Sequence, residues 1–292
     1  MGAKRGKVDG RAAGRRWMAL AAAVLVALIL AAGGLKAAQT KNRVKALFRM
    51  NKALQEENYY MAEFEFKMLG IAYFLDKGAY KKAFGLLNRL HAQLKTRAGL
   101  IKMPEFSSKA DELAFYLTLQ NPKTGAFMDD AYPLSTYHGP TENVLLHLEA
   151  LAKDIGQPLR LNYPLRYLDA INTPEKLVAF LDDVSTVGWL AARLPQTSFH
   201  NARDILTLAR DPVNYDADRL NLVISENKLY HFSAEWKRSL LQWFYDHQDP
   251  ETGLWGPTSK GGRLRKLDLN NTASVLKAFV DEKGDDIHAA FP

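Results

Sequence analysis

A pattern that occurs twice along this chain constrains its fold more than any other feature. The segments Leu113–Phe127 and Leu241–Trp255 align without a gap, and both contain Gln, then Asn or Asp, then Pro-x-Thr-Gly-x and an aromatic residue. A second shared stretch follows each copy and begins at Thr141 or Thr272 with Thr-x-x-Val-Leu-x-x-Leu/Phe. A degenerate third copy around Gly188 lies between them. The recurrence of helix, glycine turn and helix predicts stacked helical hairpins.

The composition of the repeated turn predicts its local structure. Asn121 or Asp249 can cap the local backbone in an Asx turn, and the proline that follows fixes its own φ. The glycine supplies a positive φ that few other residues tolerate. The aromatic residue can fold back over the turn, and the glutamine can bond backbone groups at the helix end. We therefore expect a clip between two helices, built by Gln120, Gly125 and Phe127 in the first copy and by Gln248, Gly253 and Trp255 in the second.

The rest of the body also has helical patterns. Apolar residues recur near helical spacing from Lys41 to Phe74, which predicts one long amphipathic helix, and Ala79 to Leu94 predicts a second. Ser108, Thr173 and Ser233 each precede a first-turn acid and an apolar run, as N-caps do. Sustained alternation with period two does not occur in the sequence. The body is therefore predicted to be all-α.

The two copies resemble the Gln-Trp repeats of the terpenoid cyclase and protein prenyltransferase superfamily. In that superfamily an aromatic-rich helix is followed by Gln, a short Asp/Gly turn and Gly-x-Trp; here Phe127 replaces the Trp of the first copy. The resemblance implies an (α/α) toroid, in which helical hairpins ring a central cavity. About ten helices are expected in the body, fewer than six hairpins require, so a complete ring and a partial or irregular ring both remain open.

The chemistry of that superfamily does not carry over. The acid motif Asp-x-Asp-Asp is absent, and its nearest approach, Asp216–Asp218, lacks the final carboxylate. The Asp pairs at 129–130 and 182–183 lack the third acid of Asp-Asp-x-x-Asp, and a chain without cysteine cannot form the prenyltransferase zinc site. The sequence also has no His-Glu-x-x-His, no Gly-x-Ser-x-Gly and no phosphate-binding glycine loop. We therefore expect no cofactor, no metal and no terpene cyclisation.

The N-terminus predicts where the body lies. The 19 residues Trp17–Leu35 carry no charge, and as a helix they would span roughly 28 Å, close to the thickness of a bilayer core. Seven basic residues and one acidic residue lie in residues 1–36, and all but one of the basic ones precede the apolar run. The positive-inside rule then predicts a single-pass membrane protein with a cytoplasmic N-terminus and an extracytoplasmic body, periplasmic in a Gram-negative cell. Ala32 and Gly34 offer a signal-peptide cleavage site as the alternative. A buried soluble helix is a third reading, against which the basic cluster argues.

Charge and hydropathy together suggest a domain organisation and exclude one partner. The remaining chain holds 32 basic and 31 acidic residues, so the overall charge of +7 is a topology signal and nucleic acid is not an expected partner. We divide the chain into a basic cytoplasmic tail (1–16), a membrane anchor or uncleaved signal (17–35), a long amphipathic helix with a helical hairpin (36–95) and the toroid repeats (96–292).

The loop Phe127–Thr141 is the best candidate for a functional site, because in a toroid it would lie at one mouth of the cavity. Its mixture of acids, tyrosines and a histidine suits acid/base work or polar-ligand binding. The alternative is a capping loop whose Asp residues bond nearby amides. The second Asp pair, Asp182 and Asp183, lies at a predicted helix C-terminus, where the helix dipole disfavours negative charge. This unfavourable placement suggests a functional role for the pair. The catalytic candidates are Asp129, Asp130, His138, Asp182 and Asp183, and the ligand-binding candidates are Tyr132, Tyr137, His138 and Glu142.

Three functions fit these observations. The leading one is a membrane-anchored extracytoplasmic protein that binds an elongated ligand, such as a glycan or lipid, or an envelope protein. The second is a polysaccharide hydrolase or lyase on an (α/α) barrel, which needs two carboxylates or a Tyr/His base around a cleft. The third is a scaffold that uses the helix from Lys41 to Phe74 to hold the body near a membrane complex. The basic loop Gly256–Arg265 is either a solvated connector or a contact for anionic lipid or glycan.

Overall fold

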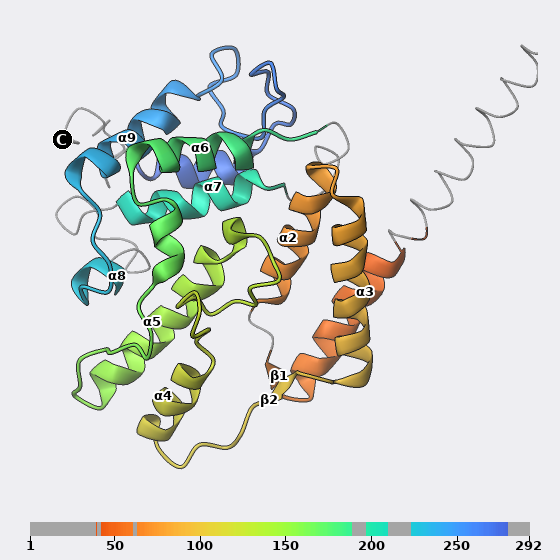
Figure 1. The fold of residues 1–292 in the computed structure, drawn as a ribbon, viewed down its shortest axis with the longest axis vertical. Helices are drawn as coiled ribbons and strands as arrows, with labels where there is room; N and C mark the ends of the chain where they lie inside the picture. The colour runs from red at the N-terminus through yellow and green to blue at the C-terminus, as the bar shows by residue number, and fades with distance from the viewer. Residues whose placement is uncertain (1–38, 40–41, 61–62, 189–196, 210–222, 280–292) are drawn as a thin grey trace, which may run out of the picture.

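The computed structural model of the chain describes residues 39, 42–60, 63–188, 197–209 and 223–279. Helices dominate these residues and confirm the all-α prediction (Figure 1). A helix over 42–56 precedes the labelled elements. They are, in order, β1 (Tyr59–Tyr60), α2 (Phe64–Asp76), α3 (Tyr80–Thr96), β2 (Ile101–Lys102), α4 (Lys109–Thr118), η1 (Leu134–Thr136), α5 (His138–Asp154), η2 (Arg166–Ala170), α6 (Pro174–Ser185), α7 (Phe199–Leu206), η4 (Thr207–Ala209), α8 (Val223–Glu226), α9 (Ala234–Asp246) and α10 (Leu269–Leu276).

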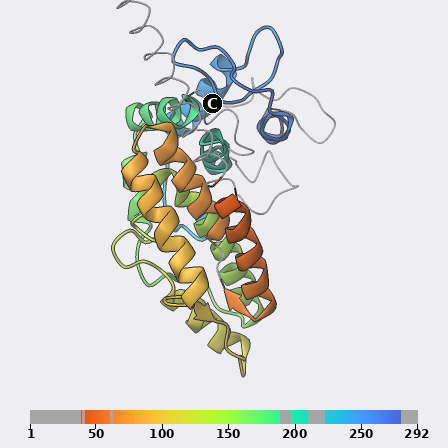
Figure 2. The ribbon, with the colours of Figure 1, turned by 90° about the vertical axis from the view of Figure 1, so that its right-hand side faces the viewer.

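The first group of helices corrects a prediction. The expected single helix from Lys41 to Phe74 is wrong, because the chain turns at Asn58, whose φ is 61°, and then enters β1. β1 pairs with β2 in antiparallel register, with Tyr59 opposite Lys102. This pairing satisfies backbone groups that a continuous helix would have bonded internally. The helix over 42–56, α2 and α3 therefore lie side by side (Figure 2), and the ring of Phe48 on the first contacts Phe64 on the second edge-on.

The predicted caps do form. The side chains of Ser108, Thr173 and Ser233 each accept a hydrogen bond from the backbone amide three residues later, at the starts of α4, α6 and α9. These bonds satisfy amides that the first turn of a helix leaves without a partner. The predicted second helix is confirmed as α3, and α2 ends at Asp76 just before Gly78, whose φ is 72°.

The helices after β2 form successive antiparallel pairs. α4 packs on α5, and α6 packs on α7. α7 also contacts both α5 and α10, while α6 contacts α9. One row therefore runs through α5, α7 and α10, and α6 with α9 lies beside it. The two segments with the repeated sequence join α4 to α5 and α9 to α10.

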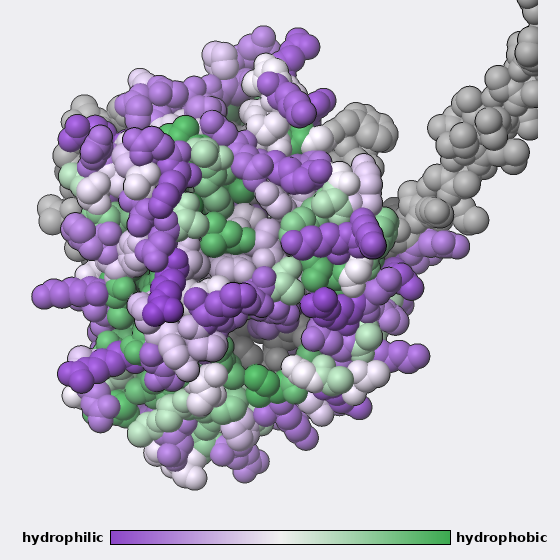
Figure 3. Space-filling model, viewed as in Figure 1, coloured by the Kyte–Doolittle hydropathy of each residue, from purple (hydrophilic) through white to green (hydrophobic). Residues whose placement is uncertain are grey.

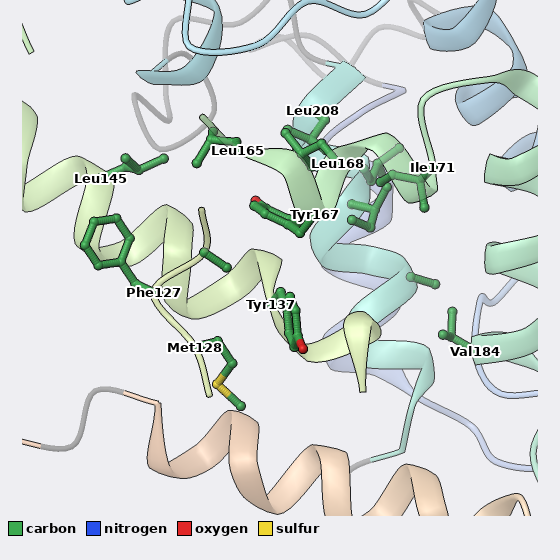
Figure 4. Close-up of a cluster of buried hydrophobic side chains, with 14 of the residues drawn as sticks. Phe127, Met128, Tyr137, Leu145, Leu165, Tyr167, Leu168, Ile171, Val184 and Leu208 are labelled. Carbon is green, nitrogen blue, oxygen red and sulfur yellow. The ribbon is translucent and has the colours of Figure 1, made fainter. Parts of the chain in front are cut away.

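A single apolar core runs through these helices. Figure 4 shows its central part, where side chains from the segment after α4, from α5 and from η2 converge, among them Phe127, Leu145 and Leu168. The largest fully buried side chain is that of Trp236 on α9, which stacks on Phe232 with 3.9 Å between ring centroids. On the face toward the viewer, hydrophilic residues predominate and hydrophobic ones form separate patches (Figure 3).

Two sequence predictions lie outside the described residues. They are the apolar segment Trp17–Leu35 and the acidic stretch Asp216–Asp218. In the part of the chain that the structure describes, no helix combines the length and the apolar character that a membrane crossing requires.

Candidate functional site

The first repeated turn forms a clip of the predicted kind. Asn121 Oδ1 accepts the backbone amide of Lys123 at 2.9 Å, and the amide of Gly125 donates to the Asn121 carbonyl at 2.8 Å. Gly125 has a φ of 74°, which explains the glycine. Gln120 Nε2 donates to the Gly125 carbonyl at 2.8 Å. The amide of Phe127 donates to Thr141 Oγ1 at 3.0 Å, so the first turn of α5 closes the clip.

The second turn repeats three of these four bonds, and its Asx bond differs, because Asp249 Oδ1 accepts the amide of Thr252 at 2.8 Å. The amide of Gly253 donates to the Asp249 carbonyl at 2.7 Å, and Gly253 has a φ of 69°. Gln248 Nε2 donates to the Gly253 carbonyl at 2.9 Å, and the amide of Trp255 donates to Thr272 Oγ1 at 2.9 Å. Because two segments 128 residues apart reach one geometry, the repeat is a structural module and not a coincidence of composition.

The degenerate middle copy does not form a clip. Gly188 has no positive φ, and its backbone amide donates to the carboxylate of Asp76 on α2. The Trp expected after it, Trp189, lies outside the described residues.

The two clips differ in what covers them. Residues 162–167 lie across the first clip: Gln120 Nε2 donates to the Tyr163 carbonyl at 2.7 Å, and Gln120 Oε1 accepts the Tyr163 amide at 2.9 Å. The amide of Tyr167 donates to the Thr124 carbonyl at 2.9 Å. Gln120 is consequently only 3% exposed. Gln248 is exposed, and within the described residues its single hydrogen bond is the one to Gly253.

The acids of the candidate loop are engaged locally. Asp129 Oδ1 accepts the backbone amide of Ala131 at 2.9 Å, and Asp130 forms a surface ion pair with Lys123 at 2.9 Å. The loop itself is shorter than predicted, because α5 begins at His138 rather than near Thr141. Pro140 is compatible with this early start, since the first turn of a helix does not use its amides. His138 and Glu142 therefore lie on a helix.

His138 is buried in the centre of the molecule. Its side chain is 2% exposed, and Nδ1 and Nε2 each hydrogen-bond with a hydroxyl group at 3.0 Å, those of Tyr167 and Thr207. Glu142 lies on the next turn, 3.8 Å from Nε2. Burial lowers the pKa of His138 to about 4, although Asp204 opposes this shift. The imidazole is neutral at pH 7 and serves as a hydrogen-bonding group of the core.

The two tyrosines are buried beside it. Burial raises the pKa of Tyr137 to about 12, and its hydroxyl donates to the Tyr132 carbonyl at 3.2 Å. Tyr132 is also buried, and its hydroxyl has no hydrogen-bond partner within the described residues. Burial raises the pKa of Tyr132 as well, while the nearby Arg89 on α3 opposes the shift.

The second Asp pair diverges at the end of α6. Asp182 accepts a hydrogen bond from Trp243 Nε1 on α9 at 2.8 Å. Asp183 binds α2 instead, where the Tyr73 hydroxyl donates to it at 2.7 Å and Lys77 pairs with it at 2.9 Å. These contacts connect α6 to its neighbours, so the unfavourable placement at the helix end has a structural explanation.

The structure does not bring the catalytic candidates together. Asp129 and Asp130 lie at a surface turn, His138 lies in the core, and the pair at 182–183 lies at the far end of α6 (Figure 1). Across the described ranges, no three His, Asp or Glu side chains lie where they could hold a metal ion together.

Among the described residues, a groove along α3 is a candidate for a binding site. It has a volume of about 830 Å³ and is lined by α3, by the turn before it and by Asp130 with Ala131 from the candidate loop. Its cations are Lys81, Lys82 and Arg89, all exposed. Asp130 is paired with Lys123 outside the groove, so the charge on the lining is mainly positive.

Sequence reasoning found only the loop side of this groove. A signal for the α3 side exists: the first turn of α3 contains Lys81 and Lys82 and no acid. Cations are unfavourable at a helix N-terminus, because the helix dipole places partial positive charge there. The stability of the helix therefore does not explain its basic first turn, but a binding function could.

A scan against protein-family models, a search of curated proteins and a search of solved structures found no match to this chain. The function must therefore be argued from the geometry of the chain itself.

Proposed function

We propose that this chain is a membrane-anchored, extracytoplasmic binding protein that holds an elongated anionic ligand in the groove along α3. The anchor and the orientation rest on Trp17–Leu35 and on the basic residues before it. The body is proposed to be a partial (α/α) toroid. Two rows of contacting helices support this: α5, α7 and α10 form one row, and α6 with α9 forms part of a second.

The observation that carries the binding function is the charge and length of the groove. The α3 residues that line it extend from Tyr80 to Arg89, about 14 Å along the helix at about 1.5 Å per residue. The two lysines are at one end and Arg89 is at the other. A ligand that meets all three cations must be extended and must carry repeated negative charge.

Tyr80 favours an acidic glycan over other anions. Its ring is 55% exposed at the end of the groove where the lysines lie. An exposed aromatic ring beside cations offers a sugar an apolar face to stack on together with partners for its carboxylates. An anionic lipid headgroup would meet the lysines but would not need the length of the groove.

The two other functions gain no support from the described residues. A hydrolase or lyase needs two carboxylates, or a base with neutralising groups, around one cleft, whereas the candidate acids are dispersed and engaged in hydrogen bonds or ion pairs. The scaffold hypothesis relied on a single helix from Lys41 to Phe74, and that helix is interrupted at Asn58.

Charge reversal in the groove is expected to abolish glycan binding. In isothermal titration of the full-length protein in detergent with hexagalacturonate, the double variant Lys81→Glu/Arg89→Glu should bind at least about tenfold more weakly, because two attractive contacts become repulsive. Lys95→Glu is the matched control, since it reverses an exposed charge on the same helix outside the groove. Equal affinity in wild type and double variant would refute the groove as the binding site. Binding of anionic lipid vesicles without binding of hexagalacturonate would refute the glycan.

A further inference from the structure

From the difference between the two clips, we infer that the second clip is a docking site for an extended basic segment of a partner polypeptide. This site lies at the turn between α9 and α10 and does not involve the groove along α3. The first clip shows how such a segment is held, because part of the same chain already occupies it.

The first clip holds the bound segment mainly through hydrogen bonds to its backbone. The amide group of Gln120 bonds both the N–H and the C=O of Tyr163, as a neighbouring β-strand would. The Thr124 carbonyl accepts a second backbone amide of the segment, that of Tyr167. Between these anchors, Pro164 lies against Gly125, and Leu165 is buried at 1% exposure. Recognition needs a short extended stretch with an apolar residue after a proline.

The second clip presents the same groups without an occupant among the described residues. Gln248 corresponds to Gln120, and its Oε1 and second amide hydrogen have no partner there. Thr252 corresponds to Thr124, and within the same ranges no backbone amide donates to its carbonyl. Around Gly253, the nearest described atom to an added Cβ is Gln248 Nε2 at 3.9 Å, so no described residue covers the surface that Pro164 covers in the first clip.

The charges around the second clip identify the class of occupant. At positions aligned with Thr118, Asn121 and Lys123 of the first clip, the second clip has three carboxylates, Asp246, Asp249 and Glu251. A segment that docks there meets negative charge on both sides of Gln248. The segment on the first clip, residues 159–167, reads Leu-Arg-Leu-Asn-Tyr-Pro-Leu-Arg-Tyr and would suit this environment with its two arginines.

The C-terminal residues 280–292 of this chain fit the site less well. They contain four acids and one lysine, and no proline followed by leucine. Like charges would oppose their approach to the three carboxylates. We therefore assign the site to another polypeptide.

The test uses a fluorescent peptide with the sequence of residues 159–167 and the full-length protein in detergent. Fluorescence anisotropy should show saturable binding, and Gln248→Ala should raise the Kd about tenfold, which corresponds to roughly one net hydrogen bond. Glu251→Lys should also weaken binding, through charge alone. Because both side chains are exposed, circular dichroism should match that of the wild type, and the thermal midpoint of Gln248→Ala should fall only slightly, through the loss of its bond to Gly253. A peptide with both arginines replaced by glutamate should bind at least tenfold more weakly.

Three results would overturn the proposal. The first is wild-type protein that does not bind the peptide, and the second is Gln248→Ala protein that binds it as well as the wild type does. The third is a different occupant: tighter binding of a peptide with the sequence of residues 280–292, or a wild-type dimer that Gln248→Ala dissociates. The groove variant Lys81→Glu/Arg89→Glu should bind the peptide normally, which separates this site from the proposed glycan groove.

Discussion

Gly125→Ala is expected to lower the free energy of unfolding by at least about 3 kcal/mol, and Gly253→Ala by only about 1 kcal/mol. Both glycines have a positive φ, so both variants incur the same backbone strain of roughly 1 kcal/mol. Only at Gly125 does the new Cβ meet an obstacle, since it would lie 1.9 Å from the Pro164 carbonyl oxygen. The chain must then move residues 162–167 away from the clip and lose the bonds of Gln120 to Tyr163.

Urea denaturation of the full-length protein in detergent, followed by far-ultraviolet circular dichroism, measures the free energy of unfolding of both glycine variants. Gly253→Ala is the control for Gly125→Ala, because the two substitutions are chemically identical and lie in two copies of the same turn. Equal losses of stability would show that residues 162–167 do not pack on the first clip as described.

Trp255→Ala is expected to lower the free energy of unfolding by about 4 kcal/mol. The indole is 4% exposed and stacks on Phe279 with 6.0 Å between ring centroids, and its Nε1 donates to the Phe244 carbonyl at 2.6 Å. Its removal leaves a cavity under the turn and takes the shorter of two hydrogen bonds from the Phe244 carbonyl, which keeps the bond from the His247 amide at 3.2 Å.

Trp255→Phe should retain most of this stability, with a loss of about 1 kcal/mol for the missing hydrogen bond. The first copy supports this expectation, because Phe127 stands at the same position and is buried to a similar degree. The same denaturation experiment measures both variants. A phenylalanine variant as unstable as the alanine variant would show that the two copies are not interchangeable modules.

The local structure of the clips could be predicted from the sequence because it depends on neighbouring residues. An Asx turn, a proline with fixed φ, a glycine with positive φ and a glutamine five residues before the carbonyl that it binds are all contained in one short segment. The caps at Ser108, Thr173 and Ser233 are local in the same sense.

What sequence reasoning missed depends on distant residues. The helix expected over 41–74 breaks because β1 pairs with β2, which lies about 40 residues further along the chain. His138 looked like a loop residue available for catalysis, yet Tyr167 and Thr207 from two other elements enclose it. The groove needs α3 and the turn at Asp130 to come together, and no periodicity in either segment encodes that contact.

The closure of one clip and the openness of the other could not be predicted either. The sequence shows Gln120 and Gln248 in equivalent positions, and nothing near Gln120 indicates that Tyr163 will bind it. Comparison of the two copies in the structure makes the difference visible. An internal repeat is informative for this reason, since the contacts of one copy can be compared with those of the other.

The most direct test of the account is the membrane topology of the full-length chain. Two fusions at the C-terminus suffice, one with a reporter active only outside the cytoplasm and one with a reporter active only inside it. The account predicts activity from the outside reporter alone, because six basic residues precede Trp17–Leu35 and should hold the N-terminus in the cytoplasm. Activity from the inside reporter alone would place the groove and both clips in the cytoplasm and contradict the proposed function.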